Sequence, residues 1–221
     1  MQRQSMIFGA TGAVGSELLK LCLDGDQYGR VIVVARRTIS LRHEKLIWIE
    51  AELDALQNLE PVSGLVDGDA FCCLGTTIKT AGSEEAFRRV DYDYVLNAAR
   101  FAKTNGVSQF SMVTALGANS ESGMLYSRTK GEIEAAIIAE GFPTLNIFRP
   151  SLLRGKRAEF RFKEEIANGL SFLMTPLFHL GLQKYKPVEI STLARALYVS
   201  AHQDIKTTSP RIFESDEIQG Y

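Results

Sequence analysis

Apolar residues along the chain fall into short unbroken runs, separated by stretches in which they recur every three or four positions. Unbroken runs predict strands covered on both faces, as in a parallel sheet, and the longer period predicts amphipathic helices. The predicted strands cover residues 5–8, 31–35, 46–50, 70–74, 109–114 and 145–148. The predicted helices cover residues 14–24, 53–59, 83–105 and 126–140. This alternation predicts right-handed crossovers and a doubly wound parallel sheet in a three-layer α/β/α arrangement.

Residues 151–221 break the alternation. They contain predicted helices at 161–170 and 191–202 and short predicted strands at 185–188 and 211–214. No repeat, low-complexity tract or linker separates this part from the rest of the chain. We therefore expect a single domain, in which residues 1–150 form the core and residues 151–221 supply a small C-terminal cap and closing elements.

Length and composition narrow the class of protein. The 221 residues are enough for one domain with a substantial core. The net charge of −1 and the pI of about 6.3 show no excess of positive charge that would favour binding to nucleic acid. Three cysteines are too few and too clustered for a disulfide framework, and they fit a reducing compartment. Because no charged and apolar leader opens the chain, we expect a soluble cytoplasmic protein.

The longest apolar run covers residues 169–182 and is interrupted by Pro176. It is too short and too broken to span a bilayer, so a pocket wall, a partner-binding face and an interfacial helix remain as interpretations. Membrane attachment rests on this run alone and ranks last. An apolar cap over a site and ordinary core are equally consistent with Phe160, Phe172, Leu173, Met174, Phe178 and Leu180.

Three glycines connect the first predicted strand to the first predicted helix. The connecting string is Gly9-Ala10-Thr11-Gly12-Ala13-Val14-Gly15. A strand, a glycine-rich turn and a helix in this order are typical of sites that bind a dinucleotide pyrophosphate at the helix N-terminus. Gly9 would allow the tight turn, Gly12 the approach of the phosphates, and Gly15 the packing of the helix near the sheet. Backbone N–H groups would come from Thr11, Ala13 and Val14. The spacing is GxxGxxG, and an ordinary glycine-rich turn is the alternative.

Two arginines, Arg36 and Arg37, follow the second predicted strand. A site for NAD usually has Asp or Glu at this point, which accepts a hydrogen bond from the ribose 2′-hydroxyl. Two guanidinium groups instead favour a 2′-phosphate through charge-assisted hydrogen bonds. The pair therefore predicts NADPH or NADP as the cofactor, and a solvated surface pair is the alternative.

Tyr126 and Lys130 are spaced i and i+4 near the start of a predicted helix, so both side chains lie on one face. A free tyrosine has a pKa of about 10, and a neighbouring ammonium lowers it. Such a phenol suits a general acid that protonates a carbonyl oxygen as a hydride arrives, or the base in the reverse reaction. Lys130 would also hold the nicotinamide ribose.

The glycine turn, the Tyr126–Lys130 spacing and the strand order resemble the short-chain dehydrogenase/reductase superfamily in its extended or atypical branch. Four further strings are similar to the Tat-interacting-protein-like NAD(P)H-binding oxidoreductases and their bacterial relatives. These strings are Phe71-Cys72-Cys73-Leu74-Gly75-Thr76-Thr77, Arg89-Val90-Asp91-Tyr92-Asp93-Tyr94-Val95-Leu96, Leu116-Gly117-Ala118 and Phe148-Arg149-Pro150. The resemblance covers about residues 5–200 and implies an NADPH-binding, Rossmann-like fold.

The resemblance implies catalytic roles position by position. Tyr126 matches the catalytic tyrosine of the superfamily, and Lys130 matches its lysine. The family carries two serines after the fifth strand, where this chain has Thr114 and Ala115. Thr114 is therefore expected to bond the substrate carbonyl, although its β-branched side chain is stiffer than serine. Asp91 stands where many extended members have Asn.

The resemblance also implies contacts with the cofactor. The segment that lines its phosphate and ribose side is matched by Leu74, Gly75 and Thr76. The segment that crosses the nicotinamide is matched by residues 150–153, beginning with Pro150.

Other candidate residues have simpler interpretations. Cys72 and Cys73 are adjacent within a predicted strand and point to opposite faces, which favours packing over a redox pair. The three histidines show no ligand spacing, so no metal site is predicted. A basic cluster after the sixth strand is either solvated surface or a contact for an anionic or polar substrate. Its members are Arg154, Lys156, Arg157 and Arg161.

The leading hypothesis is an NADPH-dependent reductase of a small carbonyl compound. Arg36 and Arg37 would select the cofactor. Tyr126 would donate the proton, Lys130 would tune it, and Thr114 would position the oxygen. The alternative is an NADPH-sensing regulatory binding protein with little or no turnover. The expected partners are a small-molecule substrate and either a second copy of the chain or a regulatory protein, with no nucleic acid and no membrane.

Overall fold

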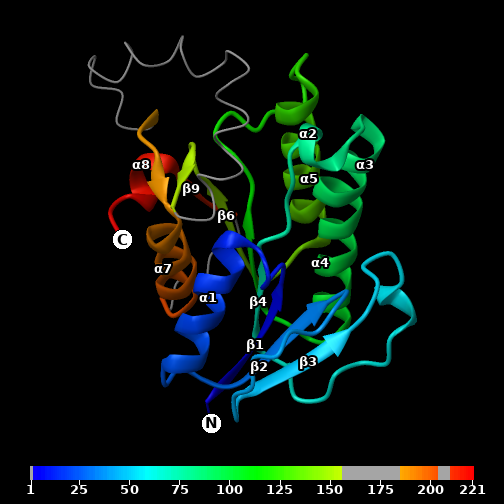
Figure 1. Ribbon diagram of the computed structural model, residues 1–221, viewed down its shortest axis with the longest axis vertical. Helices are drawn as coiled ribbons and strands as arrows, with labels where there is room; N and C mark the ends of the chain where they lie inside the picture. The colour runs from blue at the N-terminus through cyan, green and yellow to red at the C-terminus, as the bar shows by residue number, and fades with distance from the viewer. Residues whose placement is uncertain (1, 156–184, 204–209) are drawn as a thin grey trace.

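A computed structural model describes residues 2–155, 185–203 and 210–221 of the chain. These residues form a sheet of seven parallel strands in the order β3-β2-β1-β4-β5-β6-β9, with helices on both faces (Figure 1). The strands are β1 (Arg3–Phe8), β2 (Tyr28–Ala35), β3 (Leu46–Glu50), β4 (Asp69–Cys72), β5 (Gln109–Val113), β6 (Thr144–Arg149) and β9 (Arg211–Glu214). A separate parallel pair consists of β7 (Leu153–Arg154) and β8 (Val188–Glu189).

The helical segments alternate with the strands as the apolar pattern predicts. They are α1 (Ala13–Asp24), η1 (Leu56–Asn58), α2 (Ile78–Ala81), α3 (Glu84–Arg88), η2 (Arg89–Asp93), α4 (Tyr94–Thr104), α5 (Leu125–Glu140), α7 (Ile190–Ala201) and α8 (Ser215–Ile218). The doubly wound α/β fold is confirmed, because the chain runs outward from β1 to β3 and then from β4 to β6 in the other direction. Ligands of such sheets bind beyond the carboxyl ends of the strands, where the order reverses. The crevice above β1 and β4 is therefore the place to look for a site.

Each face of the sheet buries its own apolar cluster. Alternate side chains of a strand point to opposite faces, so Ile7 packs with residues of α1 and α7, whereas Met6 and Phe8 pack with residues of α4 and α5. Figure 1 shows α1 beside α7 on one face of the sheet and α4 beside α5 on the other. Because both faces are covered, the central run of β2 is apolar without interruption.

The segment 83–105 differs from the uniform helix that its period predicts. Helix α3 begins after Ser83, whose hydroxyl accepts a hydrogen bond from the Ala86 N–H, and α4 ends at Thr104. The segment η2 between them is a π-helical turn. Such a turn accommodates an extra residue and rotates the following helix face. Asp91 lies in this turn and is buried.

Two other predicted elements are shorter than expected. The helix expected at 53–59 is only the single 3-10 turn η1, and the strand expected at 185–188 is reduced to the two residues of β8. Short apolar runs specify their secondary structure weakly, because tertiary contacts decide it.

The described part of the C-terminal segment adds the last strand of the sheet and a helix on one of its faces. Strand β9 pairs in parallel with β6, and α7 packs against α1. The helix expected at 161–170, the apolar run 169–182 and the apolar cap residues lie outside the described residues. Within the described part of the chain, no helix has the length and apolar character needed to cross a membrane.

Candidate functional site

The glycine-rich turn after β1 is folded tightly against the end of β4. Gly9 has a φ of 80°, and a Cβ there would lie 2.7 Å from the Cys73 carbonyl carbon. A Cβ on Gly15 would lie 2.2 Å from the Gly9 carbonyl oxygen. The Gly12 N–H donates to the same carbonyl over 2.9 Å. The backbone geometry therefore requires glycine at positions 9 and 15, and the turn brings the start of α1 to the crevice.

The N-terminus of α1 is suited to an anion. Gly12 is its N-cap residue, no side-chain cap is present there, and no acidic residue lies in the first turn. The first N–H groups of a helix have no partner within the helix and carry a partial positive charge. Ala13 and Val14, whose backbone N–H groups are predicted to bind the pyrophosphate, lie in this first turn.

Arg36 and Arg37 follow the last residue of β2 and are exposed. They lie at the carboxyl end of this strand, as the glycine turn lies at the carboxyl end of β1. The charge of Arg36 acts on Tyr94 of α4, whose hydroxyl donates to Asp54 over 3.3 Å. Asp54 also pairs with Arg89 at 3.4 Å. Two arginines, Arg36 and Arg89, and the Asp54 carboxylate therefore lie around Tyr94, where an adenosine ribose would lie in a doubly wound fold.

Tyr126 and Lys130 lie on one face of α5, as their spacing predicts. The ammonium nitrogen of Lys130 is 6.0 Å from the centre of the Tyr126 ring. The Tyr126 ring stacks on Phe87 at 5.6 Å and is 38% exposed, whereas Lys130 is buried. Tyr126 is therefore partly exposed at the surface, while the cation beside it is shielded from solvent.

The buried cation of Lys130 has a partner that the sequence prediction missed. Asp91 Oδ1 lies 2.7 Å from Lys130 Nζ, and both side chains are buried. The other carboxylate oxygen of Asp91 accepts a hydrogen bond from the Thr76 N–H over 2.8 Å. Burial lowers the pKa of Lys130, but the charge and hydrogen bond of Asp91, together with the neighbouring Tyr126 and Cys72, outweigh it, so the pKa lies above its usual value. The sequence indicated Asp91 only through the family resemblance. A regular helical period does not predict its position beside Lys130, because Asp91 lies in the π-helical turn.

The loop after β4 lies beside the buried Lys130–Asp91 pair. A Cβ on Gly75 would lie 3.5 Å from Asp91 Oδ1 and 3.7 Å from Lys130 Nζ. Pro150 lies at the end of β6, where its carbonyl accepts a hydrogen bond from the Leu116 N–H over 2.9 Å. The loops after β4, β5 and β6 therefore lie at the same end of the sheet as the glycine turn, since all these strands are parallel.

Thr114 lies at the end of β5, but its hydroxyl donates to Glu134 Oε1 over 2.6 Å. Glu134 in turn holds the guanidinium of Arg149 through two contacts of 3.1 and 2.5 Å. These ion pairs and hydrogen bonds raise the pKa of Arg149 above its usual value. The single hydroxyl proton of Thr114 is thus engaged within the chain. Glu134 follows Lys130 by four residues, so the same helical period could have indicated it.

A small cavity of about 240 Å³ borders the start of α1. Arg154, Glu17 and Glu189 line it, and the guanidinium of Arg154 lies 3.6 Å from the carboxylate of Glu189. The other members of the predicted basic cluster lie outside the described residues. Within the described part of the chain there is no group of three His, Cys, Asp or Glu side chains that could hold a metal ion.

Comparison with known proteins defines the family. No protein-family model matches the chain. The chain is 36% identical to Protein HTATIP2 of Rattus norvegicus over 170 residues, which cover 76% of the chain and 70% of that protein. It is 30% identical to Protein FMP52, mitochondrial, of Meyerozyma guilliermondii over 213 residues, which cover 95% of the chain and 90% of that protein.

Solved structures share the fold at low sequence identity. A short chain dehydrogenase family protein from Francisella tularensis subsp. tularensis SCHU S4 has a TM-score of 0.70 and 14% identity, with 98% of this chain and 99% of that chain covered. The enzyme WbmH of Bordetella bronchiseptica, in complex with NAD+, has a TM-score of 0.66 and 17% identity, with 97% and 76% covered. These likenesses show that the chain has the fold of the short-chain dehydrogenase/reductase proteins. By its sequence, the chain belongs to the family of HTATIP2 and FMP52.

The expected cytoplasmic location is corrected by these relatives. The FMP52 proteins of Meyerozyma guilliermondii, Scheffersomyces stipitis and Debaryomyces hansenii are named as mitochondrial. The expectation rested partly on the low number of cysteines. Cysteine content reports on redox conditions and does not identify the compartment.

Proposed function

We propose that this chain is an NADPH-dependent oxidoreductase that reduces a small carbonyl compound. The observation that carries the proposal is the position of a buried ammonium beside the ring of a partly exposed tyrosine on the same face of α5. Lys130 Nζ is 6.0 Å from the centre of the Tyr126 ring and lies beside the loop of Gly75. A phenol next to a cation is a suitable proton donor for a carbonyl oxygen.

The residues around the crevice fit a dinucleotide. The cradle formed by Gly9, Gly12 and Gly15 leaves no room for side chains at its closest approaches, and the uncapped start of α1 suits a pyrophosphate. Arg36 and Arg37 would hold the 2′-phosphate, and Lys130 the nicotinamide ribose. The remaining contacts would come from Thr11, Ala13, Val14, Leu74, Gly75, Thr76 and Pro150. When bound, the reduced nicotinamide supplies the hydride.

The chain's own residues would then manage the proton. Tyr126 would donate its phenolic proton to the carbonyl oxygen, and the Lys130 ammonium would stabilise the phenolate that remains. Thr114 enters this proposal as an anchor for Glu134, because its hydroxyl proton is donated to that carboxylate. In its place, Tyr126 would be the principal hydrogen-bond donor to the substrate oxygen.

The test is to incubate the protein with NADPH and a panel of aldehydes, ketones and quinones. The oxidation of NADPH is monitored through its absorbance. Tyr126→Phe should reduce kcat by about a hundredfold or more, which is the usual contribution of a general acid, and leave NADPH affinity unchanged. Tyr221→Phe is the matched control, because that ring packs on Phe213 near the C-terminus. Undiminished turnover by the Tyr126→Phe variant would contradict the assignment of Tyr126 as the proton donor.

A second candidate function is an NADPH-sensing binding protein. The observation that favours it is the lack of a free hydroxyl donor after β5, since Thr114 donates to Glu134 and Ala115 carries no hydroxyl. Its partner would be a regulatory protein or a second copy of the chain. Tight NADPH binding in calorimetry, with no oxidation across the panel of carbonyl compounds, would support this function over the reductase.

A further inference from the structure

The Lys130–Asp91 pair joins two segments that are distant in the sequence. Lys130 belongs to α5, and Asp91 belongs to the π-helical turn η2. The two charges are 2.7 Å apart, and the side chains are only 5% and 0% exposed. A charge buried to this degree is strongly destabilising unless it is paired, so each group depends on the other.

The carboxylate of Asp91 also holds the loop that lines the crevice. Its second oxygen accepts from the Thr76 N–H over 2.8 Å, and Gly75 passes both partners so closely that an added Cβ would touch them. Asp91 is therefore in contact with the ammonium and with the cofactor-lining loop at the same time.

The groups that face the Lys130 ammonium come from three elements. Asp91 approaches from η2, Tyr126 from the same helix, and Cys72 from β4. Burial raises the pKa of Cys72 to about 12, so this thiol is neutral at physiological pH. Tyr126 is neutral whenever it acts as a proton donor. Asp91 is thus the anion that keeps Lys130 charged in its buried position.

We propose that Asp91 is a positioning residue of the hydride-transfer site, which fixes the place of the Lys130 ammonium and maintains its charge. The inference rests on the proposed function for its catalytic meaning. Its physical content is independent of turnover, because it concerns the protonation of Lys130. The charge that acts on the Tyr126 phenol is accordingly that of an ion pair and not that of an isolated cation.

The first test measures the titration of Lys130 directly by NMR of lysine side chains, with its signal assigned through Lys130→Arg. Asp91→Asn retains the shape and the acceptor for Thr76 but removes the charge. In this variant the pKa of Lys130 should fall by about one pH unit or more, because burial is then unopposed. Asp93→Asn is the matched control, since it makes the same change in the same turn at an exposed position. An unchanged Lys130 titration in Asp91→Asn would overturn the proposal.

The second test is the pH profile of kcat for carbonyl reduction. In Asp91→Asn the alkaline limb should move to lower pH, because loss of the proton from Lys130 removes the charge that assists Tyr126. A profile with the wild-type shape would count against the assignment. If the wild-type chain reduces no compound in the panel, the proposed function fails, while the Lys130 titration still decides the role of Asp91.

A third variant covers the case in which Asp91→Asn does not fold. Asp91→Glu retains the charge and moves the carboxylate by one methylene. Lys130 should then titrate as in the wild type, while kcat falls by about tenfold because the ammonium is displaced. Wild-type kcat in Asp91→Glu would show that the position of the carboxylate does not matter.

Discussion

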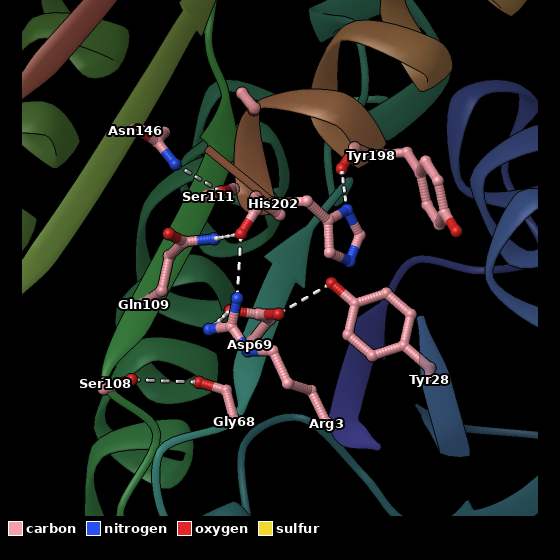
Figure 2. A network of polar contacts seen from close by, with 12 residues as sticks. Arg3, Tyr28, Gly68, Asp69, Ser108, Gln109, Ser111, Asn146, Tyr198 and His202 are labelled. Carbon is pink, nitrogen blue, oxygen red and sulfur yellow. Dashed lines mark hydrogen bonds and ion pairs between the residues drawn. The ribbon is translucent and has the colours of Figure 1, made fainter. Parts of the chain in front are cut away.

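The hydroxyl of Tyr28 lies 2.7 Å from Asp69 Oδ2, at the end of the sheet opposite the candidate site. Arg3 pairs with the other oxygen of Asp69 at 2.5 Å, and Figure 2 shows the carboxylate held between these two side chains. The three residues are the first residues of β1, β2 and β4, which are parallel neighbours. A buried polar cluster therefore joins the amino ends of the central strands.

Stability should depend on the protonation of Asp69. Burial raises the pKa of Asp69 from 3.8 to about 7, against the opposing effects of Arg3 and Tyr28. Between these values the folded chain binds a proton that the unfolded chain does not, so the free energy of unfolding falls as the pH rises. In denaturant titrations at about pH 5 and about pH 8, the wild type should lose stability relative to Asp69→Asn.

The comparison with Asp69→Asn removes the effect of His202. Burial lowers the pKa of His202, so its contribution to stability grows as the pH rises, opposite in sign to that of Asp69. His202 is present in both proteins, and its effect cancels in the difference. A difference in stability that is the same at both pH values would contradict the raised pKa of Asp69.

The Glu134–Arg149 pair should contribute more to stability than the Glu214–Arg149 pair. Glu134→Gln leaves Arg149 without its buried partner and weakens the hydrogen bond from Thr114, so we expect a loss of about 2 kcal/mol in the free energy of unfolding. Glu214→Gln alters the more exposed contact of the same guanidinium and should cost less than about 1 kcal/mol. Equal losses in denaturant titrations would show that burial does not separate the two pairs.

Gly15→Ala should disturb the glycine turn. The added methyl would lie 2.2 Å from the Gly9 carbonyl oxygen, so α1 must shift away from the turn. We expect a loss of about 1–3 kcal/mol in stability and weaker NADPH binding, measured by thermal unfolding and by fluorescence. Gly123→Ala is the control, because no atom lies within 4 Å of its added Cβ. Similar NADPH affinity in the two variants would argue against the turn as the pyrophosphate site.

Replacement of both Arg36 and Arg37 by Ala should weaken NADPH binding by about tenfold to a hundredfold, since hydrogen bonds to charged groups contribute about 1.5–3 kcal/mol. The affinity for NADH should change little, because it lacks the 2′-phosphate. Arg42→Ala, at another exposed position after β2, is the control. Parallel losses for both cofactors would mean that the pair does not read the phosphate. Calorimetry provides the dissociation constants.

The order of the elements was predictable from local patterns. Apolar runs marked the strands β1 to β6 because both faces of a parallel sheet are buried, and the helical period marked α1, α5 and α7. The same period placed Tyr126 and Lys130 on one face of α5, since side chains four residues apart on a helix are neighbours. These features follow from short stretches of chain, and the sequence by itself therefore determined them.

Only the tertiary structure decided which groups meet in the crevice. The partner of Lys130 is Asp91, which lies in a π-helical turn that a regular period does not reveal, and the hydroxyl of Thr114 is taken up by Glu134. Strand β9 joins β6 although more than sixty residues lie between them in the chain. Such contacts depend on how distant elements pack, because a buried charge or hydroxyl must find a partner in space and not along the sequence.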